Sequence, residues 1–280
     1  MAHRLVAVLC VLIVVVGCTV LDYAQSPAKI GLLAPFEGRY REVGYDALYA
    51  ARLALADAGV DHIELLAVDD GGTVTTATAR ARALADDPQV KAVIVLGYDA
   101  AHTDTLAALA DLPVVIAGDW GVDAPDSNHY ILASAEISDM LTVDPRITIT
   151  KAAQADAPVT GGTVFGLAQY PALRSDLAGV QVISSGTLPD AAFTARILEA
   201  NPFAEPPGLL ATTVYDATGM LVQTISNAGT TRTQVIADLT GITYIGINGE
   251  IRFVDSYWRS APTNMYIYED RQLAPANGEQ

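Results

Sequence analysis

The segment from Lys29 to Gly118 alternates short apolar runs with alanine-rich stretches, and this pattern constrains the fold more than any other feature of the sequence. The apolar runs cover residues 30–34, 63–68, 90–96 and 114–116. The stretches between them, at 43–58, 73–86 and 103–110, place alanine and leucine on one face of a helix. Strands that are apolar throughout are buried on both faces of a sheet. The pattern therefore predicts a doubly wound parallel α/β sheet.

The remainder of the chain is less regular and predicts a second, reduced α/β lobe. We expect strands at 129–132, 163–165 and 180–183, and helices at 170–177, 190–200, 210–227 and 233–239. Short β-like runs at 244–247, 251–254 and 265–268 follow near the end. Residues 273–280 are polar and contain proline and glycine, which predicts a frayed tail.

The charge and the motif content exclude several function classes. The chain has 280 residues, with 32 acidic against 16 basic side chains and a net charge of −16, so a nucleic-acid partner is not expected. Two cysteines and four histidines leave little material for a zinc site, and we expect neither a metal nor a cofactor. No phosphate loop, dinucleotide fingerprint, nucleophile elbow or metalloprotease helix occurs in the sequence. The chain is therefore not expected to be an enzyme.

The N-terminus has the pattern of an exported protein. One basic residue, Arg4, precedes an apolar run from Leu5 to Val16, which is too short to span a bilayer and is typical of a signal peptide. The run ends at Gly17-Cys18, which resembles a bacterial lipobox. We expect residues 1–17 to be the signal peptide, Cys18 to be lipidated, and residues 18–28 to tether the protein to the outer face of the cell membrane. The alternative is an ordinary signal peptide with an incidental cysteine.

Polar and aromatic side chains follow the predicted strands at the edge where ligands bind in open parallel sheets. Aromatic faces beside carboxylates suit a ligand that bears a cation or an amine. For Asp99 and Asp119 the alternative is a carboxylate that complements a helix dipole. Asp69 and Asp70 are expected to form a strand-end turn and helix cap. The residues predicted to gather in one crevice are Tyr40, Tyr98, Asp99, His102, Asp119 and Trp120.

Several motifs along the chain resemble the type I periplasmic binding proteins, the leucine/isoleucine/valine-type substrate-binding proteins of ABC importers. The motifs that carry the resemblance are Lys29–Gly38 with its P-x-x-G turn, Val43-Gly44, Ala50–Leu55, Leu66–Gly72, Val93–Gly97, Tyr215–Thr218 and Gly249–Phe253. The resemblance implies a two-lobed clamshell that captures a small solute and delivers it to a membrane permease with a cytoplasmic ATPase. It implies lobe one at 29–121 and 209–255, with lobe two and the hinge segments at 122–208 and 256–272.

The sequence departs from the family pattern in two respects. The chain is short for a protein with two full α/β lobes, and after 129–132, which resembles the start of lobe two, the usual strands are not recognisable. In the amino-acid binders, hydroxyls after the third and fourth strands hold the ligand carboxylate. The nearest positions here are Ala100 or Ala101 and Trp120 or Gly121, which carry no hydroxyl. Backbone N–H groups, or His102 and Thr103 in a shifted loop register, are the remaining candidates, and Ala101 is included in the predicted site.

Three functions remain open from the sequence. The first is a lipid-anchored solute-binding protein of an ABC importer that takes an amino acid, amine or amide. The second is a degenerate relative that acts as a sensor or protein-interaction module, which predicts an exposed apolar surface where lobe two should close. The third is an extracytoplasmic enzyme, motivated only by His102 near Asp99 and Asp119.

Overall fold

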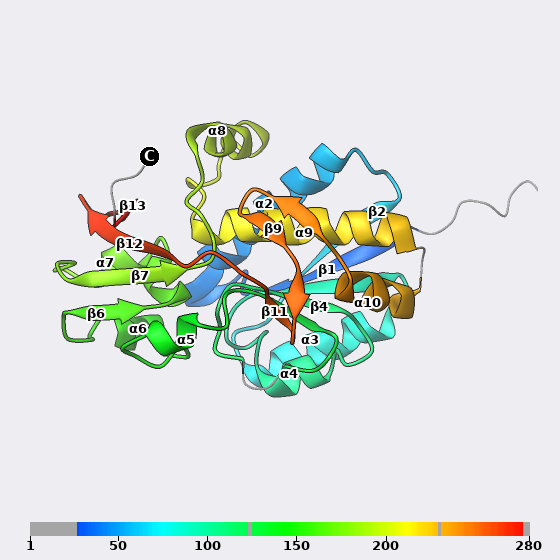
Figure 1. The fold of residues 1–280 in the computed structure, drawn as a ribbon, viewed down its shortest axis with the longest axis horizontal. Helices are drawn as coiled ribbons and strands as arrows, with labels where there is room; N and C mark the ends of the chain where they lie inside the picture. Colours follow the sequence, from blue (N-terminus) through cyan, green and yellow to red (C-terminus); the bar gives the residue numbers. More distant parts are fainter. Residues whose placement is uncertain (1–26, 123–124, 229–230, 277–280) are drawn as a thin grey trace, which may run out of the picture.

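The computed structural model describes residues 27–122, 125–228 and 231–276, and these fold into two α/β lobes (Figure 1). The predicted signal peptide and Cys18 lie outside the described residues. None of the described helices combines the length and the apolar character needed to cross a membrane. The mixed architecture with a parallel-sheet core confirms the predicted fold class.

Lobe one is built on a sheet with the order β10-β11-β5-β4-β3-β1-β2 in the described part of the chain. Strands β2, β1, β3, β4 and β5 are parallel, and their registers pair Ala34 with Asp69, Leu33 with Val95, and Val95 with Ile116. The carboxyl ends of these strands therefore share one edge of the sheet. The strands are β1 (Ala28–Ala34), β2 (Ile63–Asp69), β3 (Val90–Val95), β4 (Val114–Ala117), β5 (His129–Leu132), β10 (Phe253–Val254) and β11 (Tyr257–Trp258).

Helices cover both faces of this sheet, as the alternation of strands and helices predicts. Helices α2 and α9 pack together on one face, and α3 and α4 lie on the other (Figure 1). The small buried side chains of Ala47, Ala51 and Ala54 let α2 lie close to its neighbours. The 3-10 helix η1 and the helices are η1 (Gly38–Tyr40), α2 (Arg41–Ala58), α3 (Val74–Asp86), α4 (Thr103–Ala107), α9 (Leu209–Ala228) and α10 (Arg232–Thr240).

Strand β5 belongs to the sheet of lobe one, which corrects its assignment to the start of lobe two. It runs parallel to β4, with Val114 opposite His129 and Ala117 opposite Leu132. All four of its residues are buried, and the open edge of β4 gives this apolar run a partner and a covered position. The late strand β11 then pairs with β5 at Tyr257, so residues near 257 also lie in lobe one.

Lobe two is smaller and has a sheet of order β13-β12-β7-β6 within the described residues. Its helices α5, α6 and α7 have four residues each. That this lobe is shortened relative to the family stays a prediction. Its elements are α5 (Ile137–Met140), α6 (Ile149–Ala152), β6 (Val159–Gly161), the 3-10 helix η2 (Thr163–Gly166), α7 (Tyr170–Leu173), β7 (Val180–Ser184), β12 (Asn264–Glu269) and β13 (Gln272–Pro275).

Two local expectations for lobe two are wrong. Residues 163–165 form η2 instead of a strand, because the chain turns back at Gly161-Gly162 and the Phe165 ring lies where a Cβ of Gly161 would be. The frayed tail was expected to start at residue 273, but Gln272–Pro275 forms β13 and pairs with β12. Residues 277–280 lie outside the described residues.

Helix α8 (Ala191–Ala200) follows β7 but packs on lobe one. Arg196 of α8 forms an ion pair with Asp57 at the end of α2. The Tyr215 hydroxyl of α9 donates to the same carboxylate at 2.6 Å, and the Phe193 and Tyr215 rings meet edge-to-face at 5.5 Å. The chain between the lobes is therefore fastened to lobe one at this point.

A buried carboxylate ties α9 to the hairpin of β8 (Tyr244–Gly246) and β9 (Gly249–Ile251). Asp216 is fully buried and accepts hydrogen bonds from the backbone N–H groups of Ile247 and Asn248 at 2.8 and 2.9 Å, and from the Asn248 side chain at 2.7 Å. The Asn248 Oδ1 atom in turn accepts from the backbone and hydroxyl of Thr187, beyond β7. Burial raises the pKa of Asp216, while these donors lower it. This network connects lobe one to the chain that leaves lobe two.

The close approach of α2 to the end of β1 gives a stability test. A Cβ added at Gly44 would lie 2.3 Å from the Pro35 carbonyl oxygen, so we expect Gly44→Ala to destabilise the protein by about 3 kcal/mol in chemical unfolding. Gly241→Ala is the matched control, because nothing lies within 4 Å of its added Cβ, and we expect a change within about 0.5 kcal/mol. Equal stability of the two variants would contradict this packing.

Candidate ligand-binding site

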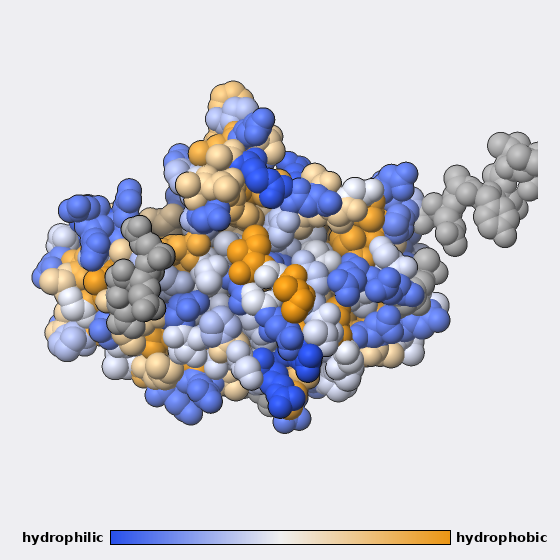
Figure 2. Space-filling model, turned by 45° about the horizontal axis from the view of Figure 1, so that its top comes forward, coloured by the Kyte–Doolittle hydropathy of each residue, from blue (hydrophilic) through white to orange (hydrophobic). Residues whose placement is uncertain are grey.

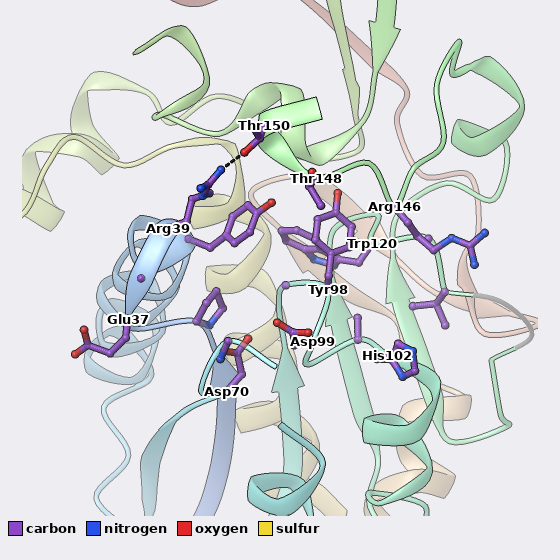
Figure 3. A pocket seen from close by; sticks show the side chains of 18 of the residues that line it. Glu37, Arg39, Asp70, Tyr98, Asp99, His102, Trp120, Arg146, Thr148 and Thr150 are labelled. Carbon is purple, nitrogen blue, oxygen red and sulfur yellow. Dashed lines mark hydrogen bonds between the residues drawn. The ribbon is translucent and has the colours of Figure 1, made fainter. Parts of the chain in front are cut away.

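A cavity of about 660 Å³ lies between the carboxyl ends of the lobe-one strands and a segment of lobe two (Figure 3). Lobe one contributes the loops after β1, β2, β3 and β4, and lobe two contributes Arg146, Thr148 and Thr150. The volume falls in the usual range for small-molecule sites, roughly 300–1,000 Å³. The parallel register accounts for the position, because it brings four strand ends to one edge.

Most of the residues predicted from the sequence meet in this cavity. Asp119 is not among the lining residues. Its Oδ1 accepts from the Gly121 N–H at 3.1 Å, its backbone N–H donates to Thr163 at the lobe junction, and its buried Oδ2 has no hydrogen-bond partner. Burial raises the pKa of Asp119. The predicted residues that do line the cavity are Tyr40, Tyr98, Asp99, Ala101, His102 and Trp120.

Two tyrosine hydroxyls hold lobe two against lobe one. The Tyr98 hydroxyl donates to the Ile147 carbonyl at 2.7 Å, and the Tyr40 hydroxyl accepts from the Ile149 N–H at 3.0 Å. Burial raises the pKa of both tyrosines, which therefore stay neutral. The Tyr98 hydroxyl proton is therefore used by lobe two, whereas the Tyr40 hydroxyl accepts there and keeps its own proton to donate. Both residues line the cavity. The Tyr98 ring meets the Tyr40 ring at 6.2 Å and the Trp120 ring at 5.3 Å, both edge-to-face.

Asp70 lines the floor of the cavity, a position that the sequence did not predict. It is only 2% exposed, and its Oδ1 accepts from the Gly72 N–H at 2.8 Å, which is the expected strand-end turn. The cap of α3 is Thr73, whose side chain accepts from the Thr76 N–H. Burial raises the pKa of Asp70 to about 6, and the nearby charge of Asp99 adds to this. Burial likewise raises the pKa of Asp99.

The remaining polar groups of the cavity are mostly engaged in the fold. His102 caps α4, because its Nδ1 accepts from the Asp104 N–H at 3.2 Å. Arg39 donates to the Thr150 hydroxyl across the cavity (Figure 3), and Arg146 lies beside Asp144 at 3.4 Å. Arg39 was not predicted, but its position in the loop after β1, next to the predicted Tyr40, could have indicated it. The lobe-two residues carried no signal in the sequence.

The described residues contain no cluster of three or more side chains that could hold a metal ion. The Ala101 N–H is also unavailable to a ligand, because it donates to the Gly97 carbonyl at 2.9 Å. Where the amino-acid binders place a hydroxyl, this chain thus offers neither a hydroxyl nor that N–H group.

The comparisons with known proteins place the first part of the chain in a family. Residues 27–135 match the family described as "Periplasmic binding protein". This stretch, which is less than half of the chain, is similar to the periplasmic binding protein family. The predicted resemblance is confirmed, and a solved structure of this fold covers 88% of the chain. No curated protein sequence matches this chain.

Solved structures share this periplasmic binding protein fold at low sequence identity. LivJ from Streptococcus pneumoniae, a branched-chain amino acid transporter substrate-binding protein in complex with isoleucine, is 15% identical, with a TM-score of 0.67 over 88% of this chain and 97% of that one. The leucine-binding protein LivK from Thermotoga maritima is 12% identical, with a TM-score of 0.71 over 89% and 97%. An ABC transporter solute-binding protein from R. palustris in complex with benzoate is 14% identical, with a TM-score of 0.66 over 89% and 95%.

The raised pKa of Asp70 gives a pH-dependent stability test. Between an ordinary carboxyl pKa of 3.8 and a folded-state pKa of about 6, the folded protein binds more protons than the unfolded chain, so Asp70 destabilises the fold as pH rises through this window. Asp70→Asn removes the charge and keeps an acceptor for the Gly72 N–H. We expect its melting temperature to exceed that of the wild type by about 2–4 °C at pH 8, roughly 1 kcal/mol after solvent screening, with the difference shrinking towards pH 4.

The control is Asp61→Asn, which removes a fully exposed carboxylate. We expect no comparable pH-dependent gain from this variant. A difference between Asp70→Asn and the wild type that is the same at both pH values would contradict the assignment.

Proposed function

We propose that the protein is the solute-binding component of an ABC importer and captures a small polar solute of the amino acid, amine or amide class between its lobes. The observation that carries the proposal is the cavity of about 660 Å³, which is lined by both lobes and crossed by the hydrogen bonds of Tyr40 and Tyr98. A solute in this cavity touches both lobes, so its binding favours the closed arrangement.

The known proteins with this fold support a binding role over an enzymatic one. Those described above are binding proteins with isoleucine, leucine or benzoate named as ligands. The enzyme hypothesis depended on His102, whose Nδ1 is committed to capping α4. The permease and the ATPase are the partners that this role requires.

The alternative of a protein-interaction module predicts an exposed apolar surface where lobe two closes. The lobes instead meet around a cavity that contains carboxylates, and on the face shown in Figure 2 hydrophobic residues form separate patches among hydrophilic ones. A second hollow of about 880 Å³ between α2 and residues 203–209 is lined by exposed rings such as Phe203, which is 99% exposed. Among the residues that line this second hollow, Asp46 is the one acid whose pKa burial raises, and its carboxylate already accepts from the Gly208 N–H. The second hollow therefore offers a solute less than the cavity between the lobes does.

Calorimetry with leucine, isoleucine, benzoate and small amines and amides tests the proposal. We expect at least one of these solutes to bind with micromolar to millimolar affinity. A solute at 100 times its dissociation constant should stabilise the protein by about 2.7 kcal/mol. Failure of every solute to bind or to raise the melting temperature would contradict the proposed function.

Tyr98→Phe tests whether closure contributes to that affinity. The variant loses the hydrogen bond to Ile147 and keeps the ring, so we expect about fivefold weaker binding, which corresponds to about 1 kcal/mol. Tyr45→Phe is the matched control, because Tyr45 lies on α2 outside this cavity and is exposed. Unchanged affinity in Tyr98→Phe would separate ligand binding from lobe closure.

The proposed membrane anchor is a lipidated Cys18, directly after the predicted signal peptide of residues 1–17. We expect Cys18→Ala to move the protein from the membrane fraction to the soluble fraction of expressing cells. The measurement is fractionation combined with metabolic labelling by a radioactive fatty acid. Labelling that persists in the variant would show that another residue carries the lipid.

A further inference from the structure

The carboxylate of Asp70 is buried and only half satisfied. The side chain is 2% exposed, and its Oδ1 atom accepts from the Gly72 N–H. Its Oδ2 atom has no hydrogen-bond or ion-pair partner in the described part of the chain. Asp70 is one of the residues that line the cavity. A buried charge without a partner is costly, so this oxygen is suited to a group that enters the cavity.

The charged groups around Asp70 leave the floor of the cavity negative. Asp69 and Asp99 both raise the pKa of Asp70, and Asp69 is occupied by the N–H groups of Phe36 and Gly71. The other charged or titratable side chains that line the cavity are Glu37, Arg39, His102 and Arg146, and Arg146 lies beside Asp144. Among the described residues, no cation forms an ion pair with Asp70 or Asp99, since Arg39 is held by Thr150 above them (Figure 3).

The aromatic walls above this negative floor also favour a cation. The Tyr98 ring stands above Asp99 (Figure 3), the Tyr40 ring meets it edge-to-face, and aromatic faces attract cations. A carboxylate finds no hydroxyl at Ala100 or Ala101, and the Ala101 N–H is already bonded to Gly97. The two arginines that line the cavity are engaged elsewhere, Arg39 with Thr150 and Arg146 with Asp144.

We propose that the cavity selects solutes that carry a cationic nitrogen, and that Asp70 Oδ2 is the main counter-charge for this nitrogen, with Asp99 as the second. This inference rests on the proposed solute-binding function and names the class of solute. A cation requires the ionised carboxylate, so binding displaces the proton from Asp70 when that proton is present.

Two matched series of probes test the inference by calorimetry. One is benzylamine, benzamide and benzoate, and the other is isopentylamine, isovaleramide and isovalerate. Within a series the apolar group is constant and the polar group is cationic, neutral or anionic. The proteins are the wild type, Asp70→Asn and the control Asp61→Asn, whose exposed carboxylate lies outside the cavity.

We expect at least one amine to bind more tightly than its amide and its carboxylate. Asp70→Asn should weaken binding of the amine about 10–100-fold and leave the amide unchanged, while Asp61→Asn changes neither. At pH 6, titrations in two buffers of different ionisation enthalpy should show about half a proton released per amine bound, because the pKa of Asp70 is about 6. This release should be absent in Asp70→Asn, a result that a purely structural role of Asp70 would not produce.

The remaining outcomes separate the two proposals. If an amide or a carboxylate binds as tightly as its amine, or if Asp70→Asn weakens all members of a series equally, the cation inference is wrong and the solute-binding function stands. If no member of either series binds at millimolar concentration while leucine or isoleucine does, the cation inference also fails alone. If none of these solutes binds, both proposals fail.

Discussion

The parallel pairing of β2, β1, β3 and β4 is the constraint on which the site depends. The parallel register brings the loops after these strands to one edge, and each loop then contributes to the same cavity. Gly97 shows how closely these loops meet. Its φ is +92°, and an added Cβ would lie 3.1 Å from Pro35 and 3.6 Å from Asp70 Oδ2. The glycine thus lets three loops converge on the floor where Asp70 lies.

The same convergence produces an unfavourable charge. Asp70 and Asp99 are brought together on that floor, and burial with mutual repulsion raises the pKa of Asp70. A protein selected for stability alone has no use for this arrangement, whereas a binding site gains from a charge that is already desolvated and waiting for a partner. The cost to the unliganded fold and the gain on binding a cation have one physical origin.

The second lobe completes the site through backbone groups. Tyr40 and Tyr98 extend from lobe one and bond to the backbone of 147–149, so the contact depends on where that segment lies and hardly on which side chains it carries. Helix α8 and the Asp216–Asn248–Thr187 network fix the chain segments that connect the lobes. A small lobe held in this way can close a cavity without a large interface of its own.

The strand-end part of the site was predictable, because periodic apolar runs define the strands and parallel sheets place their ends together. Tyr40, Tyr98, Asp99, His102 and Trp120 follow from that reasoning. Asp70 was missed because an Asp-Asp-Gly-Gly sequence is typical of a strand-end turn. Only the packing of the neighbouring loops shows that Asp70 both makes this turn and lines the cavity. Asp119 does not line the cavity, because its carboxylate is buried and accepts from the Gly121 N–H, a local turn that the strand pattern does not specify. Arg146, Thr148 and Thr150 carried no local pattern, since their position depends on tertiary contacts with two distant tyrosines.

The cavity between the lobes is the solute site in our proposal, and its floor holds a cationic nitrogen. A crystal structure of the protein grown with the tightest-binding amine of the two series tests this most directly. We expect the amine nitrogen to lie within hydrogen-bonding distance of Asp70 Oδ2, with the Tyr98 hydroxyl still bonded to Ile147. An empty cavity, or an amine bound in the hollow beside Phe203, would contradict it.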